Sequence, residues 1–154
     1  MKWITREKAR VDRIACPWLI KRFVDPQAEF IFVPKDRVLK EAEETGAIPF
    51  DVPGAELFHY REGNSEFVSF DSVIKKYHLN DSALLELARI VRGADASIPD
   101  TPPESAGLEA AATGFQLISH DDFDNMRLQF PLYDALYEYC RSKVNEGKVL
   151  KHSV

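Results

Sequence analysis

The segment EFIFV, residues Glu29 to Val33, is the strongest strand signal in the chain and decides how its first half is interpreted. It is apolar and rich in the aromatic and β-branched residues that strands prefer. A shorter strand is expected before it at Trp3–Thr5, and another after it within Ala47–Val52. Helical patterns separate the three strands, and this alternation is typical of a parallel or mixed sheet.

Two helices are expected between these strands. The first is predicted to begin near Cys16, because Pro17 suits the first position of a helix, where its missing N–H costs nothing. It should end before Asp25–Pro26, since the residue before a proline disfavours helical geometry. The second helix covers residues 35–45 and is closed by Gly46.

The second half of the chain begins with a hairpin signal and is then helical. Two β-rich runs flank Gly63–Asn64, which indicates a tight turn between antiparallel strands. Helices are expected within 72–79, 81–95, 103–118 and 121–144. The sequence therefore predicts an α/β fold, with a small mixed sheet of about three to five strands and covering helices in the N-terminal half and a mainly helical C-terminal half. We expect one domain over residues 1–154, with a β/α part to about residue 72, a helical part to about 145, and a tail over 146–154.

The composition excludes several classes of function. The net charge of −5 argues against broad contact with nucleic-acid phosphates or anionic lipid. The chain has no secretory signal and no apolar run long enough to span a bilayer, so we expect a cytoplasmic protein that binds neither membrane nor nucleic acid by itself. Its two cysteines form no disulfide or zinc-finger pattern. No phosphate-binding or dinucleotide-binding motif occurs, so no nucleotide cofactor is expected.

Cys16 is the predicted catalytic residue. At a helix N-terminus its thiolate would be favoured by free N–H groups and by the helix dipole. Arg13 and Arg22 would add positive charge there and attract a small oxyanion. The alternative is that Cys16 is an inert buried side chain, because free cysteine is among the most buried residue types.

A metal site is predicted on the hairpin. A two-residue turn would place Glu56 opposite Asp71 and His59 opposite Val68. Facing carboxylates repel one another unless a proton or a cation lies between them, so Glu56, His59 and Asp71 are predicted to bind a divalent or transition metal ion. This grouping requires a bulge near residues 53–54, and a register shift of one residue removes it.

The segment RIVRGAD, Arg89 to Asp95, is the third candidate. Gly93 is predicted to end a helix, with Arg92 binding an anion and Asp95 accepting a proton or supporting the metal. The alternative is that both charged residues only serve the helix end.

The motifs RVDRIACPWLIKRFVDP, EFIFVP, FDVPGAE with a histidine three residues on, LARIVRGAD and YDALY closely resemble the chromate resistance protein family. This family forms the C-terminal part of the regulator ChrB, and the resemblance runs from about Trp3 to Tyr137. Asp12, Asp51 and Asp95, expected as supporting residues, lie within these motifs. The other residues of this chain in the family's motifs are Arg13, Cys16, Trp18, Glu56, His59 and Arg92.

The resemblance implies a protein that helps bacteria withstand chromate, by sensing it or by handling the metal. Chromate is a tetrahedral dianion that arginines would bind and a thiolate would reduce. Val68 stands where many relatives carry a cysteine, and the DNA-binding N-terminal region of the regulators is not in this chain. The leading hypothesis is therefore metal or oxyanion binding with a redox role for Cys16. The alternatives are a non-catalytic regulatory or interaction module, including a homodimer, and a metal-dependent hydrolase.

Overall fold

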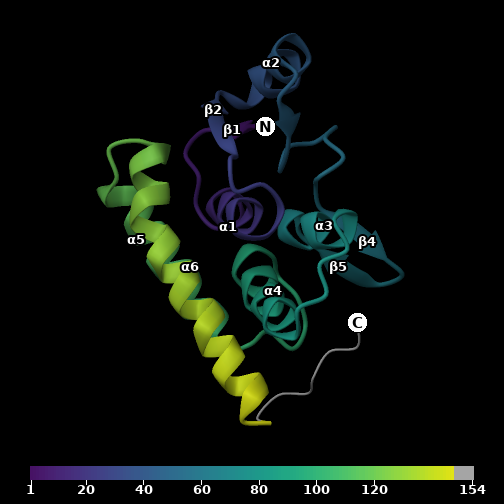
Figure 1. Ribbon diagram of the computed structural model, residues 1–154, viewed down its shortest axis with the longest axis vertical. Coiled ribbons are helices and arrows are strands. Elements are labelled where there is room, and N and C mark those ends of the chain that lie inside the picture. The colour runs from purple at the N-terminus through teal and green to yellow at the C-terminus, as the bar shows by residue number, and fades with distance from the viewer. Residues whose placement is uncertain (148–154) are drawn as a thin grey trace.

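The first half of the protein is built on a three-stranded parallel sheet, which lies in the purple and blue part of the chain at the top of Figure 1. The computed structural model describes residues 1–147, so the part of the predicted tail from residue 148 onward lies outside the described residues. Strand β1 (Lys2–Arg6) lies between β2 (Glu29–Val33) and β3 (Ile48–Pro49) and is parallel to both. The predicted α/β fold is confirmed.

The two faces of this sheet carry separate clusters of apolar side chains. Successive residues of a strand point to opposite faces. Trp3 and Phe30 accordingly join the main core, which includes helix α1 (Asp12–Leu19). Ile4 joins a smaller cluster with Val38 at the start of helix α2 (Val38–Thr45). Helices α1 and α2 therefore cover opposite faces of the sheet.

Helix α1 begins four residues earlier than predicted. Its first N–H bonds run from Ile14 and Ala15 to the carbonyl of Val11, so Cys16 and Pro17 lie inside the helix. Pro17 has no N–H to donate, yet the helix tolerates it and continues as a π-helix, η1 (Ile20–Val24). The prediction of a helix N-terminus at Cys16 is wrong, because burial of the first turn outweighs the preference of proline for position one.

The segment between β2 and β3 follows the prediction. A short 3₁₀-helix, η2 (Lys35–Arg37), leads into α2. Gly46 ends α2 with φ +76°, a left-handed conformation that costs glycine little.

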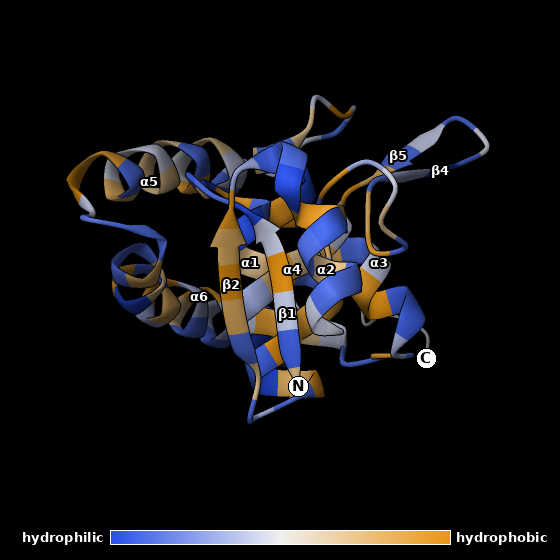
Figure 2. Cartoon of the chain, turned by 90° about the horizontal axis from the view of Figure 1, so that it is seen from above, coloured by the Kyte–Doolittle hydropathy of each residue, from blue (hydrophilic) through white to orange (hydrophobic). Residues whose placement is uncertain are grey.

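The predicted hairpin is present and extends from the body of the molecule (Figure 2). Strands β4 (Tyr60–Glu62) and β5 (Ser65–Phe67) pair antiparallel, with Tyr60 opposite Phe67 as expected. The ladder stops there, because helix α3 (Ser69–Lys76) begins two residues after β5 ends. The predicted pairing of Glu56 with Asp71 is therefore wrong.

The remaining helices are α4 (Ser82–Asp95), α5 (Glu104–Ile118) and α6 (Asp122–Asn145), which pack against one another (Figure 1). Gly93 does not end α4 as predicted. A Cβ atom there would lie 2.4 Å from Ser105 Oγ, so Gly93 allows the start of α5 to approach α4 closely. None of the helices in the described residues is long and apolar enough to cross a membrane.

Candidate functional site

A polar cavity of about 300 Å³ lies at the carboxyl edge of the parallel sheet. Arg6 is the last residue of β1, and Asp51 follows the end of β3 by two residues. In open α/β sheets, ligands bind in the crevice outside the carboxyl ends of the strands. The cavity is lined by Arg6, Arg10, Val11, Asp12, Arg13, Asp51, Phe58, His59 and Asp95.

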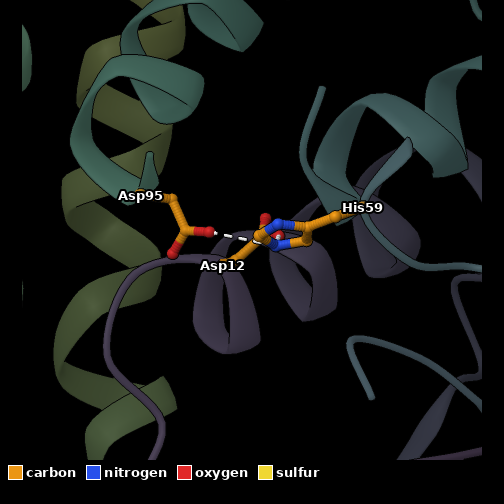
Figure 3. Close-up of side chains that lie close together, drawn as sticks. All are labelled: Asp12, His59 and Asp95. Atoms are coloured by element: carbon orange, nitrogen blue, oxygen red, sulfur yellow. Dashed lines mark ion pairs between the residues drawn. The ribbon is translucent and has the colours of Figure 1, made fainter. Parts of the chain in front are cut away.

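The His59 side chain points toward Asp12 and Asp95 (Figure 3). Its Nε2 atom lies 3.3 Å from Asp95 Oδ2, 3.4 Å from Asp51 Oδ1 and 3.7 Å from Asp12 Oδ2. These distances exceed the usual range of about 2.7–3.2 Å for an N–H···O bond, and one imidazole nitrogen carries only one proton. Three carboxylates therefore converge on a single donor that cannot satisfy them all.

The Asp12 carboxylate is held by two backbone N–H groups at the start of helix α3. Its Oδ2 atom accepts the backbone N–H of Ser69 at 2.8 Å, and its Oδ1 atom accepts that of Phe70 at 3.1 Å. Burial, reinforced by the charges of Asp51 and Asp95, raises the pKa of Asp12 to about 8. A carboxylate placed in this way is fixed in position but costly to ionise.

Asp51 is held from the side. Its Oδ1 atom accepts a hydrogen bond of 2.6 Å from the Ser69 hydroxyl, and its Oδ2 atom lies 3.3 Å from Arg13 Nη1. Burial alone would raise the pKa of Asp51, but hydrogen bonds from His59 and Ser69 and the charge of Arg13 bring it below its usual value. Asp51 has φ +56°, a left-handed conformation that aspartate adopts more readily than most residues.

The three carboxylates act in turn on the imidazole. The close polar contacts with Asp12, Asp51 and Asp95 raise the pKa of His59 to about 12. Without a metal ion, His59 is therefore a positively charged imidazolium at neutral pH. Its positive charge offsets the repulsion between the carboxylates around it. Asp12, His59 and Asp95 each offer a ligand atom, and these atoms all lie within 4.8 Å of one another.

The metal-free protein is expected to lose thermal stability between about pH 6 and about pH 8.5, because its folded state binds more protons than its unfolded state there. The pKa of Asp12 is raised from 3.8 to about 8 and that of His59 from 6.5 to about 12, so both groups make stability fall as pH rises. Thermal unfolding in chelator across this range measures the effect. Asp12→Asn should flatten the dependence, whereas Asp36→Asn on η2 should not. A rise in stability across the range would contradict this.

Three cationic side chains also line the cavity. Arg6, Arg10 and Arg13 line it, although only Arg13 was predicted. Among the described residues, Arg6 Nε and Arg13 Nε are buried without a hydrogen-bond partner. The sequence does carry a signal for Arg6, because it stands at the carboxyl end of a predicted parallel strand.

Cys16 lies behind the cavity and does not line it. It is fully buried, and its Sγ atom lies 3.5 Å from Asp12 Oδ1. Burial, followed by the charges of Asp12 and Asp51, raises the pKa of the Cys16 thiol well above its usual value. The environment expected for a thiolate is absent here, because α1 begins at Asp12 and the nearest charges are negative.

The other two predicted metal ligands lie apart from His59. Glu56 is exposed and pairs with Lys76 at 2.6 Å. Asp71 accepts the Val68 N–H at the start of α3 and forms a two-bond ion pair with Arg92 at 2.7 and 3.0 Å. The structure thus brings His59 together with its predicted supporting residues instead.

The predicted anion-binding residues Arg22 and Arg92 also lie outside the cavity. Arg22 donates two hydrogen bonds, from Nε and Nη2, to the two oxygens of the Asp134 carboxylate at 3.0 Å each. Arg92 is occupied by Asp71 and lies over the Phe67 ring. Of the three arginines predicted to bind an oxyanion, the structure places only Arg13 beside His59.

The protein is therefore an α/β protein with a cavity of carboxylate, histidine and arginine side chains at its sheet edge. Sequence comparison identifies its family. The family described as "ChrB, C-terminal domain" matches residues 3–140, and this chain belongs to it. Protein ChrB of Cupriavidus metallidurans is 34% identical over 144 residues, which are 92% of this chain and 41% of that protein. The chain thus spans less than half of this relative's length. No solved structure matches.

Proposed function

We propose that this chromate-resistance domain binds a divalent metal ion together with a small tetrahedral oxyanion in the cavity around His59. The observation that carries the proposal is the convergence of Asp12, Asp51 and Asp95 on one imidazole nitrogen, in a cavity that three arginines also line. The metal ion would take the place of the proton on His59. The oxyanion would lie between the metal ion and the arginines.

The distances around His59 support a metal ion. Metal–ligand bonds of about 2.0–2.2 Å place the ligands of a tetrahedral ion about 3.3–3.6 Å apart. The carboxylate oxygens lie 3.3, 3.4 and 3.7 Å from His59 Nε2. One imidazole and several carboxylates suit Mn²⁺, Fe²⁺ or Zn²⁺. The bonds from Ser69 to both Asp12 and Asp51 are outer contacts of the kind that orient metal ligands.

The charges in the cavity support an oxyanion beside the metal ion. With a metal ion keeping Asp12 ionised, the three carboxylates and the three guanidinium groups that line the cavity balance one another. A dication with neutral His59 as ligand therefore leaves two positive charges. A tetrahedral dianion such as chromate, sulfate or molybdate would neutralise them, and guanidinium groups bind such anions with two parallel hydrogen bonds. This favours dianions over monoanions.

The burial of Cys16 supports a binding and regulatory role over electron transfer through a thiolate. Its thiol is fully buried, and its pKa is raised by burial and by two neighbouring carboxylates. Oxidation by chromate requires an accessible thiolate. We infer that the domain reports the presence of an oxyanion, and that the response is transmitted to a partner.

The proposal is tested by calorimetric titration of molybdate, which is not a strong oxidant, and of chromate. Each is added to protein loaded with Mn²⁺ or Zn²⁺ and to protein treated with chelator. We expect saturable binding to the loaded protein and binding at least about tenfold weaker to the treated protein, since the metal ion supplies the charge excess. Equal affinity in the two forms, or no binding in either, would overturn the proposal.

A further inference from the structure

The connection between β1 and α1, residues 7–11, is held by a helix more than a hundred residues away. The Asp122 carboxylate, in the first turn of α6, accepts the backbone N–H of Lys8 at 3.0 Å and that of Ala9 at 2.7 Å. Asn125, one turn further on, donates to the Ala9 carbonyl at 2.8 Å. This connection carries Arg10 and joins Arg6 to Arg13. Its conformation therefore sets the backbone positions from which these arginine side chains reach the cavity.

These contacts belong to a buried polar network. Asn125 and Gln129 are 1% and 0% exposed, and Gln129 Nε2 donates to Asn125 Oδ1 at 2.7 Å. That bond fixes the Asn125 amide with its nitrogen toward Ala9. The connection is therefore held by hydrogen bonds to side chains whose own orientation is fixed.

The conformation of Lys8 explains why the connection needs these stabilising contacts. Lys8 has φ +62°, a left-handed conformation that is unfavourable for a lysine. In this conformation its carbonyl accepts bonds from Arg13 Nη2 at 3.2 Å and from Gln116 Nε2 at 2.7 Å. The strained turn thus directs the Arg13 guanidinium, and the contacts with α6 hold the turn.

We propose that Asp122 and Asn125 are positioning residues for the oxyanion half of the site, which they do not touch. This inference rests on the proposed function. The metal half depends on other anchors, because Asp12 is held by α3, and Asp95 belongs to α4. Loosening the connection therefore weakens oxyanion binding and leaves metal binding intact.

A matched pair of variants in the first turn of α6 tests this. Asp122→Asn keeps the side chain's shape but turns one of its two acceptors into a donor, which cannot serve both backbone N–H groups. Asp124→Asn removes the same charge from the same turn, but within the described residues the Asp124 carboxylate bonds the His120 N–H and Arg127 and does not bond the connection. Mn²⁺ affinity is measured alone, and molybdate affinity on the Mn²⁺-loaded protein.

We expect Asp122→Asn to bind molybdate about 10- to 100-fold more weakly, as the loss of outer contacts does at other sites. Its Mn²⁺ affinity should stay within about twofold, and Asp124→Asn should match the unchanged protein in both. Asn125→Asp, which replaces the donor to Ala9, should show the same split.

Two results would overturn the inference in distinguishable ways. Equal molybdate affinity in Asp122→Asn and the unchanged protein refutes the positioning role alone. Absence of molybdate binding by the Mn²⁺-loaded unchanged protein refutes the proposed function and this inference with it. A parallel loss of Mn²⁺ and molybdate affinity in Asp122→Asn would show a general structural role and would also refute the positioning role.

Discussion

His59→Ala is expected to weaken Mn²⁺ or Zn²⁺ binding by about 100-fold or more. A structural zinc site distributes about 10–16 kcal/mol over four ligands, so loss of one ligand costs several kcal/mol. His59 Nε2 lies within 3.3–3.7 Å of all three carboxylates of the cavity. Competition titration against a chelating dye measures the affinity, and elemental analysis measures the metal that remains bound after purification without an affinity tag.

His120→Ala is the control for this variant. His120 is exposed on the connection between α5 and α6, and only its backbone N–H contacts Asp124. Removal of this imidazole should leave metal affinity within about twofold. If His59→Ala kept the affinity of the unchanged protein, the proposed metal centre would be wrong.

Arg6→Met is expected to weaken oxyanion binding to the metal-loaded protein by about 10- to 100-fold, since a hydrogen bond to a charged group contributes about 1.5–3 kcal/mol. Arg6 lines the cavity, and its buried Nε atom has no hydrogen-bond partner among the described residues, whereas Arg13 is engaged by Asp51. Methionine retains most of the apolar stem, so the change removes mainly the charge. Calorimetric titration with molybdate measures the loss.

Metal affinity should respond to Arg6→Met in the opposite sense. Removal of a positive charge from the cavity wall favours a dication, so Mn²⁺ affinity should stay equal or rise. Arg127→Met, which removes an exposed arginine paired with Asp124 on α6, should change neither affinity. Unchanged molybdate binding in Arg6→Met would contradict a role for the cavity's arginines in binding the oxyanion.

Much of the fold could be predicted from the sequence because its signals are local. The aromatic run at β2, the left-handed Gly46 after α2 and the two-residue turn between β4 and β5 are each determined by neighbouring residues. The start of α1 could not be predicted in this way. Its first turn is fixed by burial of Ile14 and Ala15 in the core, which are tertiary contacts.

Part of the candidate site could be predicted from the sequence, but Arg6 and Arg10 and the grouping of its residues could not. The sequence predicts His59 as a metal ligand and Asp12, Asp51 and Asp95 as supporting residues, but it groups His59 with Glu56 and Asp71 because the hairpin register is extended too far. The ladder ends because α3 starts at Ser69, whose N–H is bound by Asp12, 57 residues earlier. Pattern and spacing within one segment carry no information about such a contact.

The most direct test of a metal site at His59 is the X-ray absorption fine structure of the protein loaded with one equivalent of Zn²⁺. We expect nitrogen and oxygen ligands at about 2.0–2.2 Å with one imidazole and no sulfur, because His59 and the carboxylates supply the ligands and the Cys16 thiol stays behind Asp12. A sulfur ligand at about 2.3 Å, or a shell without imidazole, would contradict it.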